Sequence, residues 1–357
     1  MHVQTTWVAL LATLPTAFAF WPTYYSQNAN NANNVGSVNS VNPHSNDEPN
    51  VTIETVFQFP NNGSWIVNLV ERRDGSLLLT RLDTPEVWSL DPATGTAELV
   101  HSFPMVTSCF GISEIEDDVF AVVIGNFSST TYQPTPGSFV VQKIDFSNAA
   151  ARTEGANAGH TVSEIAAIPE AVALNGMTSF TRESHLVLIA DSPVGLGWKL
   201  NTQSGEYSVA LNNTKLRPAE GQALPLGVNG LKVLNDYVYY SSTTHMEFGR
   251  VKVNSEAMPV GDYETIASGF LPDNFDVASD GTAYIATDPQ NSVVRITPSG
   301  QIALVGGGQL STQMPGATSC RLTSDEKTVY VGTSGGQVAP VLGQFMEPAK
   351  VVKITFN

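Results

Sequence analysis

The sequence predicts an all-β protein, a six-bladed β-propeller, from three observations. Short runs that alternate apolar and polar residues are separated by Gly, Asp and Pro, a pattern typical of antiparallel meanders. The pattern recurs six times at intervals of about 43 to 66 residues, which brackets the blade lengths of propellers. No long segment shows an apolar period of 3.6 residues, so helices should be nearly absent.

The clearest repeating unit spans residues 273–300. An extended run ends at the turn signal 279–281, and residues 282–287 then alternate as a second strand. After a polar break at 288–292, residues 293–297 form a third run. One such meander is too small to be stable alone, so several must pack together.

The other five units repeat this order of turn and strand. Their runs after the first turn span residues 76–80, 119–124, 185–190, 237–241 and 327–333. The last unit ends at residues 351–356, one strand short, whereas 51–59 is a spare alternating strand before the first unit. We expect this N-terminal strand to close the last blade, because closure removes exposed strand edges.

The N-terminal region predicts a secreted protein. Residues 1–19 read as a signal peptide, with an apolar run too short to span a bilayer and small residues, Ala17 and Ala19, for cleavage. Residues 20–50 are rich in Asn and Ser and are expected to be disordered, ahead of one propeller domain at 51–357. N-glycosylation acceptor patterns, consistent with secretion, occur at Asn50, Asn62, Asn126 and Asn212.

The charge balance limits the partners. Lys and Arg number 17 against 33 Asp and Glu, which gives a formal net charge of −16. An acidic chain without basic clusters is a poor binder of nucleic acid or of anionic membranes. We therefore expect small-molecule substrates, no nucleic acid, no membrane after signal removal, and a monomer or a dimer.

The two cysteines leave two alternatives open. Cys109 and Cys320 each follow Thr-Ser at the start of an innermost strand, in the second and sixth units. An oxidising compartment permits a disulfide between them. Because the first blade separates those two units, the sulfur atoms can also lie too far apart, as two buried free thiols.

Equivalent positions near the start of each innermost strand are rich in asparagine. Asparagine is depleted within strands, so its recurrence calls for an explanation. Each amide can simply cap turn backbone, or together they can form a polar channel mouth that binds a ligand. The six positions are Asn68, Phe110, Asn175, Asn229, Asn274 and Ser319.

These features resemble the gluconolactonase/regucalcin family of six-bladed propellers, especially its fungal secreted branch. The phrases NLVERRDGSLLLT, LNGMT, GVNGLKV and DGTAYIAT carry the resemblance, which covers nearly everything from about residue 51 onward. The resemblance is specific for the fold and less so for activity.

The resemblance implies a candidate metal site for calcium or another divalent cation. The family holds its cation with one Glu, two channel Asn and one Asp, which match Asn175, Asn229 and Asp273 here. Val67 stands where the Glu is expected, and Glu71 is an imperfect substitute deeper along the strand. A single carboxylate is a weak site for a hard cation, which disfavours lactone hydrolysis and favours a reaction without any cofactor.

The fungal branch also includes hetero-Diels–Alderases, which add a tropolone o-quinone methide to a humulene-type sesquiterpene. Such a reaction requires proximity, hydrogen bonds to the tropolone oxygens and exclusion of water. The resemblance implies that Asn68, Asn175 and Asn274 bind substrate. Candidate wall residues, each of which can equally be ordinary blade core, are Trp65, Phe110, Met177, Trp198, Tyr240, Met246 and Phe275.

For the dehydration that forms the quinone methide, His245 on a mouth loop is the first candidate for proton transfer. Asp273 is its alternative, with Asn229 beside it. Three function classes therefore stay open: a hetero-Diels–Alderase that needs no metal, a metal-dependent lactonase, and a secreted binding propeller without catalysis.

Overall fold

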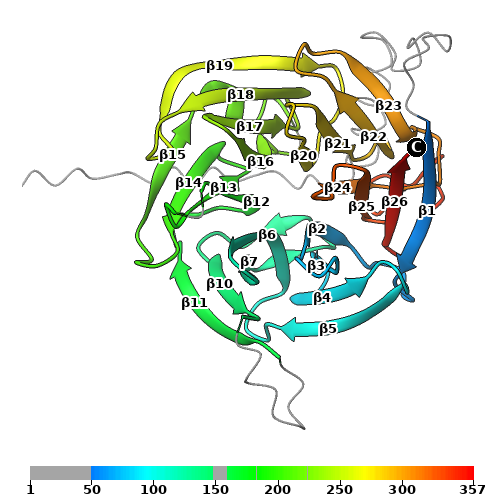
Figure 1. Ribbon diagram of the computed structural model, residues 1–357, viewed down its shortest axis with the longest axis horizontal. Helices are drawn as coiled ribbons and strands as arrows, with labels where there is room; N and C mark the ends of the chain where they lie inside the picture. The colour runs from blue at the N-terminus through cyan, green and yellow to red at the C-terminus, as the bar shows by residue number, and fades with distance from the viewer. Residues whose placement is uncertain (1–49, 148–158, 182, 223) are drawn as a thin grey trace, which may run out of the picture.

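The computed structural model describes residues 50–147, 159–181, 183–222 and 224–357 as six four-stranded antiparallel sheets. The sheets are arranged radially around a central channel, as Figure 1 shows. This confirms the six-bladed propeller predicted from the sequence. The expected signal peptide, and the expected lead-in up to residue 49, lie outside the described residues.

The first three blades follow one another along the chain, each with its first strand at the channel. Blade 1 consists of β2 (Ile66–Glu71), β3 (Leu77–Arg81), β4 (Glu86–Asp91) and β5 (Thr96–Ser102). Blade 2 consists of β6 (Ser108–Glu116), β7 (Val119–Gly125), β10 (Val140–Asp145) and β11 (Thr161–Ala167). Blade 3 consists of β12 (Leu174–Ser179), β13 (Leu186–Asp191), β14 (Leu196–Asn201) and β15 (Tyr207–Asn212).

The other three blades complete the ring. Blade 4 consists of β16 (Val228–Leu234), β17 (Tyr237–Ser242), β18 (Glu247–Val253) and β19 (Pro259–Ser268). Blade 5 consists of β20 (Phe275–Val277), β21 (Ala283–Thr287), β22 (Ser292–Ile296) and β23 (Ile302–Gly307). Blade 6 consists of β24 (Ala317–Leu322), β25 (Thr328–Thr333), β26 (Lys350–Phe356) and, outermost, β1 (Val51–Gln58).

The N-terminal strand closes the ring as expected. Strand β1 pairs antiparallel with the C-terminal strand β26, from Val51 opposite Phe356 to Gln58 opposite Lys350. The two ends of the described chain therefore share one blade, beside each other in Figure 1. This pairing satisfies the edge that β26 would otherwise expose.

Little else interrupts the sheets in the described residues. The connection between β7 and β10 forms a small hairpin of β8 (Phe127–Ser128) and β9 (Gln133–Pro134), and a 3₁₀ turn, η3 (Thr214–Leu216), precedes blade 4. Among the residues described, no helix has the length and apolar character needed to cross a bilayer.

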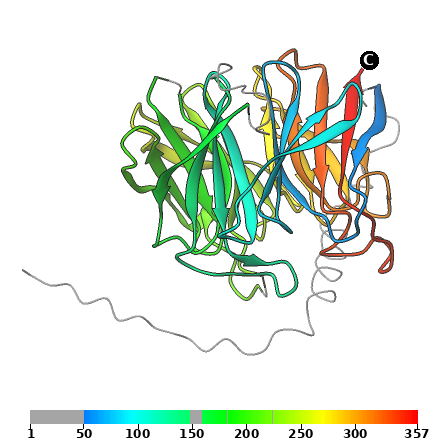
Figure 2. The ribbon, with the colours of Figure 1, turned by 90° about the horizontal axis from the view of Figure 1, so that it is seen from below.

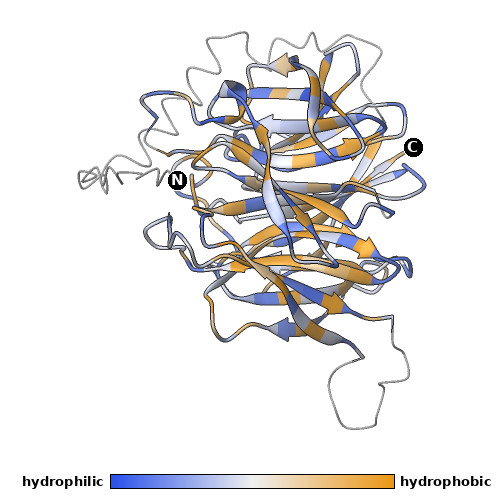
Figure 3. Ribbon diagram, turned by 90° about the vertical axis from the view of Figure 1, so that its left-hand side faces the viewer, coloured by the Kyte–Doolittle hydropathy of each residue, from blue (hydrophilic) through white to orange (hydrophobic). Residues whose placement is uncertain are grey.

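The blades are held together by apolar side chains packed between neighbouring sheets. Figure 3 shows hydrophobic residues mainly along the strands and hydrophilic ones mainly in the turns. The two cysteines belong to different interblade clusters, Cys109 beside Phe120 and Val122, and Cys320 beside Val331. Both thiols are buried and free, so the candidate Cys109–Cys320 disulfide is not formed. The reason is that Cys109 lies in the core between blades 1 and 2, whereas Cys320 lies in the core between blades 5 and 6.

Antiparallel order sends the connections alternately to two faces of the ring. We call the face on which the innermost strands begin the mouth face, and the opposite one the far face. The mouth face carries the connections 59–65, 82–85, 103–107, 126–139, 168–173, 192–195, 213–227, 243–246, 269–274, 288–291, 308–316 and 334–349. In Figure 2 the β8–β9 hairpin and the loop 334–349 project from the same, lower side of the ring.

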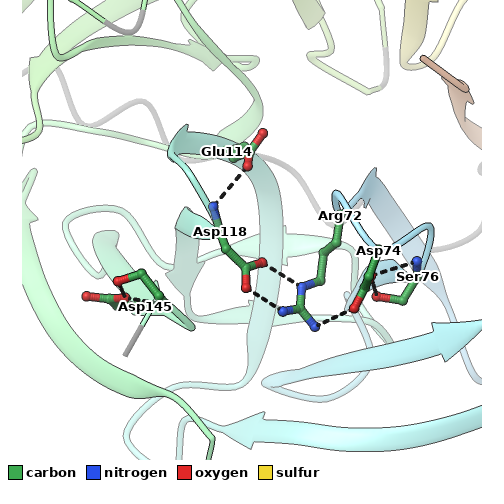
Figure 4. Close-up of polar contacts among 7 residues, drawn as sticks. Arg72, Asp74, Ser76, Glu114, Asp118 and Asp145 are labelled. Carbon is green, nitrogen blue, oxygen red and sulfur yellow. Dashed lines mark hydrogen bonds and ion pairs between the residues drawn. The ribbon is translucent and has the colours of Figure 1, made fainter. Parts of the chain in front are cut away.

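Apart from the connection 146–160, most of which lies outside the described residues, the far face consists of turns of six residues or fewer, many of them charged. Figure 4 shows one network there, in which the guanidinium of Arg72 in blade 1 donates to both carboxylate oxygens of Asp118 in blade 2, at 2.8 and 2.7 Å. Arg72 also lies 3.7 Å from Asp74 and stacks on the ring of Phe146, 4.2 Å from its centroid. These contacts tie two neighbouring blades together.

The innermost strands share one irregularity that matters for function. Pairing to the second strand shifts register at the asparagine positions, for example between Leu174 and Met177 in β12 and between Val228 and Leu231 in β16. Such bulges redirect side chains, here toward the channel. A glycine follows Asn175 and another follows Asn229. A Cβ at Gly176 would lie 2.5 Å from the backbone oxygen of Asn229, so no larger residue fits there.

Candidate functional site

A cavity of about 420 Å³ opens at the mouth face, where the channel begins. Blades 1 and 2 supply an apolar side, and the connections leading into blades 3 and 4 complete it. Val338, in the long loop of blade 6, adds to this wall. The apolar lining residues are Trp65, Val67, Leu82, Phe110, Phe127, Pro134, Pro136, Val172, Ala173, Leu174, Pro193, Leu224, Pro225, Leu226 and Val338.

The polar groups of the cavity gather on the opposite side, on blades 3 to 5. The amide of Asn175 donates to Ser192 at 3.2 Å and to Asn229 at 3.1 Å. Asn229 donates in turn to Thr243 at 3.2 Å, and Thr243 donates to the backbone oxygen of Pro272 at 2.8 Å. All four side chains line the cavity, so the network presents fixed amide and hydroxyl groups to a ligand.

Two carboxyl groups complete this polar side, Asp273 before β20 and Asp288 after β21. Burial raises the pKa of Asp273 well above its usual range, and the nearby charge of Asp288 raises it further, although a hydrogen bond from Asn229 opposes the shift. Burial raises the pKa of Asp288 to about 7, against a hydrogen bond from Ser334. The cavity therefore holds two carboxyl groups that burial makes easier to protonate, and the charge of Asp288 adds to this effect at Asp273.

Two aromatic residues with polar groups line the cavity from the apolar side. The indole N–H of Trp65 is buried and has no hydrogen-bond acceptor among the described residues. The hydroxyl of Tyr132 in the β8–β9 hairpin donates to the backbone oxygen of Gln337 at 3.2 Å. The hairpin of blade 2 thereby reaches the loop of blade 6 and closes the cavity above Trp65, whose ring centroid lies 6.1 Å from that of Tyr132.

The asparagine positions form two groups rather than one ring around the cavity. Asn175 and Asn229 face the cavity together with Asp273. Asn68 and Asn274 are buried outside its lining, where the amide of Asn274 donates to Asn68 and the hydroxyl of Ser319 approaches the same oxygen at 3.4 Å. Asn68 and Asn274 therefore lie beside the channel and hydrogen-bond to each other, and they do not form part of the cavity wall.

Of the expected aromatic and methionine walls, only Trp65 and Phe110 line the cavity. The side chains of Met177, Trp198, Tyr240 and Phe275 lie in hydrophobic clusters between or within blades. Trp198 belongs to a third strand and Tyr240 to a second strand, whereas the channel is lined by first strands. Met177 comes two residues after Asn175 but beyond the bulge, which turns its side chain into the blade interface.

The expected proton-transfer residue His245 lies on the mouth face, in the turn between β17 and β18 together with Met246. Its side chain is exposed, and neither residue belongs to the cavity lining. Met246 adopts a positive φ of 56° at the tip of this tight turn. The turn therefore directs both side chains away from the channel.

The oxygen donors in the cavity match the type of ligand that a hard divalent cation prefers. Asn175, Asn229 and Asp273, the expected ligands, are brought together, and Asp288 adds a second carboxylate. One oxygen of Asp288 is buried without a hydrogen-bond donor among the described residues. Val67 lines the cavity where the resemblance expects a Glu, whereas Glu71 lies outside the lining and accepts from the backbone of Ser324 at 3.1 Å.

Asp288 is the residue that sequence reasoning missed. It stands in the segment interpreted only as a polar break between two strands. Its position in the repeat could have indicated it. The second strand of each blade ends at the mouth face, and the residue directly after that strand lines the cavity or contacts Asp288 in several other blades. These residues are Leu82, Ser192, Thr243 and Ser334. Tyr132 and the rim loops carry no comparable signal.

Comparison with known proteins supports the resemblance inferred from the sequence. A protein from Phoma sp., provisionally named a hetero-Diels–Alderase, is 27% identical over 310 residues, which cover 77% of this chain and 84% of the relative. A second protein of the same provisional name, from Sarocladium schorii, is 25% identical over 310 residues, covering 76% of this chain and 74% of the relative. No family model matches the chain.

Solved structures share the fold at low identity. A luciferin-regenerating enzyme superimposes with a TM-score of 0.61 at 11% identity, covering 86% of this chain and 95% of its own. Regucalcin from Agrobacterium tumefaciens gives 0.54 at 13% (85% and 96% covered), and a gluconolactonase from Xanthomonas campestris gives 0.53 at 12% (87% and 95% covered). The chain thus resembles gluconolactonase/regucalcin-like propellers in fold and hetero-Diels–Alderases in sequence.

Proposed function

We propose that the protein is a pericyclase of fungal secondary metabolism that couples a tropolone o-quinone methide to a humulene-type sesquiterpene by a hetero-Diels–Alder reaction. The names of the two relatives support the reaction class. The substrate pair is what the resemblance of the sequence implies, and the two-sided cavity supports it. No metal or cofactor is required in this proposal.

The observation that carries the proposal is the two-sided cavity. Trp65, Phe110 and Phe127 present a hydrocarbon wall that fits a terpene, whereas Asn175, Asn229 and the two aspartates present hydrogen-bonding groups that fit the oxygens of a tropolone. Two reactants that are already bound on facing walls lose little further translational and rotational entropy when they react. Proximity of this kind can lower the activation free energy by roughly 7–11 kcal/mol.

The acid pair supports the dehydration that must come first. A protonated carboxyl donates its proton to the departing hydroxyl of a hydroxymethyl tropolone, and the C–O bond breaks with release of water. The ionised partner accepts the proton of the ring hydroxyl, which leaves the neutral o-quinone methide. Asp273 and Asp288 are suited to these two roles because they are buried together, while His245 is exposed.

The coupling itself forms two bonds in one step and transfers no proton. A hydrogen bond from the hydroxyl of Ser192 or from a protonated carboxyl to the quinone methide oxygens would lower the energy of the acceptor orbital. Tyr132 covers part of the cavity and would limit the access of water to the electrophile, which otherwise reverts to the alcohol.

The proposal is tested with the purified protein, a hydroxymethyl tropolone and a humulene-type alkene. We expect one stereoisomer of the coupled product at a rate at least tenfold above buffer, unchanged by EDTA. A protein that binds the tropolone without raising the rate would be a binding propeller instead. A product rate and isomer ratio equal to those in buffer would contradict the proposal.

A second candidate, metal-dependent lactone hydrolysis, is favoured by the second carboxylate. Asn175, Asn229, Asp273 and Asp288 would hold a divalent cation, which would polarise a lactone carbonyl and activate water. This candidate predicts tight binding of one Ca²⁺ by calorimetry, and lactone hydrolysis that EDTA abolishes. Absence of both results would eliminate it.

We also propose that the protein follows the secretory pathway. The acceptor residues Asn50, Asn62 and Asn212 are exposed, and Asn126 is half-buried. The test is to treat the protein from its native host with an endoglycosidase. An unchanged electrophoretic mobility after treatment would show that the protein carries no N-glycans and would argue against secretion.

A further inference from the structure

Large apolar side chains are exposed mainly on the mouth face. Nine such residues are exposed in the described part of the chain, and six of them lie in mouth-face connections, so their distribution is uneven. Met105 is 88% exposed, and Leu310 and Leu342 are 67% and 64% exposed. The six residues, spread around the opening of the cavity, are Met105, Val194, Leu310, Leu342, Phe345 and Met346.

The same connections are almost free of charge. The segments 103–107, 192–195 and 308–316, which expose Met105, Val194 and Leu310, contain no charged residue. The loop 334–349 contains only Glu347, which forms an ion pair with Lys350 at 2.6 Å. In a chain with a net charge of −16, apolar tips without flanking charges form a distinct surface.

The apolar wall of the cavity extends into one of these loops. Val338 lines the cavity and belongs to the same loop as Leu342 and Phe345. A hydrocarbon substrate is concentrated in membranes rather than in water, since each CH₂ group that leaves water favours the transfer.

We propose that the mouth face docks on the uncharged surface of a lipid bilayer, with the side chains of Met105, Leu310 and the 342–346 tip inserted among the headgroups. Docking deepens the proposed function, on which it rests for its apolar substrate. A basic protein partner would be drawn instead to the acidic turns of the far face, such as those at Asp117 and Asp325. An uncharged lipid surface suits these tips because the segments 103–107, 192–195 and 308–316 that carry three of them contain no charged residue.

This proposal changes one expectation from the sequence. The net charge of −16 argued against membranes, because anionic lipids repel an acidic protein. The fold places most charged turns on the far face, so the mouth face can approach a zwitterionic surface without that repulsion. The net charge of the whole chain does not show how the charged residues are distributed between the two faces.

The test is sedimentation of the purified full chain with phosphatidylcholine vesicles. Protein made in bacteria carries no glycan at Asn62 or Asn126, which both lie in mouth-face connections. We expect the protein to pellet with vesicles, and the double substitution Leu342→Asp with Met346→Asp to lower the partition coefficient at least tenfold. Val260→Asp is the matched control, because Val260 is 58% exposed at the start of the outer strand β19, near the far face.

Each outcome decides a separate point. Wild-type protein that stays in the supernatant, or pellets equally well with the double substitution, overturns membrane docking. Dimerisation in size-exclusion chromatography that the double substitution abolishes assigns the face to a second copy and also overturns it. Docking without coupling activity would contradict only the proposed function, and activity on dissolved substrates without docking would contradict only this inference.

Discussion

The mouth face and the far face are made by the same strands but do different work. On the far face, short turns carry charged residues that pair between blades, as Arg72 pairs with Asp118. On the mouth face, longer loops carry apolar side chains outward and leave two carboxyl groups, Asp273 and Asp288, buried at the cavity. Both faces carry ion pairs, but Asp273 and Asp288 have no basic partner among the described residues, which leaves them available to a ligand.

This difference indicates how a propeller can acquire a reaction without losing its stability. The far-face turns fix the spacing of neighbouring blades. The mouth loops can then vary in length and sequence, as the long connections 126–139 and 334–349 do. Three substitutions test this division, from the largest expected effect to the smallest.

The largest effect is expected from removing an acid of the mouth face. Asp273→Asn keeps the shape of the side chain but can neither donate nor accept the transferred proton, so we expect the coupling rate to fall by roughly 100-fold or more. The measurement is product formation from the hydroxymethyl tropolone. Asp280→Asn, in an exposed far-face turn of the same blade, should leave the rate within twofold, and equal losses in the two variants would refute the division.

The next effect concerns stability against pH. The folded-state pKa of Asp288, about 7, lies above its ordinary value of 3.8, so its stabilising contribution is complete below pH 4 and is lost as pH rises through 7. Asp288→Asn cannot ionise. Relative to wild type, it should therefore gain up to about 4 kcal/mol between pH 4 and pH 8.

Urea unfolding at both pH values, with EDTA present so that no cation neutralises the pair, measures this gain. A stability difference between wild type and variant that is the same at pH 4 and pH 8 would show that Asp288 is not strained by its burial.

The smallest effect is expected on the far face. Arg72→Ala leaves Asp118 without its bidentate partner and removes the stacking on Phe146, which should lower the free energy of unfolding by about 2 kcal/mol. The coupling rate per folded molecule should not change. Arg73→Ala, whose ion pair with Asp117 is exposed, should cost less than about 0.5 kcal/mol, and a lower coupling rate in Arg72→Ala would link the two faces.

Much of the candidate site followed from the repeat. Asn175, Asn229 and Asp273 occupy equivalent or adjacent places in their units, so a correct count of blades brings them together. Asp288 was missed because it lies in a connection, where sequence periodicity ends. Trp198 and Tyr240 were wrongly assigned to the cavity wall, because the sequence does not distinguish aromatic residues on the four strands of a blade. Only the first strand of each blade reaches the channel.

The sequence by itself determined the six blades, the strand that closes them and the amides at the channel. These features depend on local alternation and turn residues, which hydrogen-bonded strands repeat wherever they occur. Only the tertiary structure decided that the thiols are free, that Asp288 lines the same cavity as Asp273, and that most exposed apolar side chains gather on one face. Those features depend on distances between residues far apart in the chain, because burial and electrostatic interaction are properties of space rather than of sequence order.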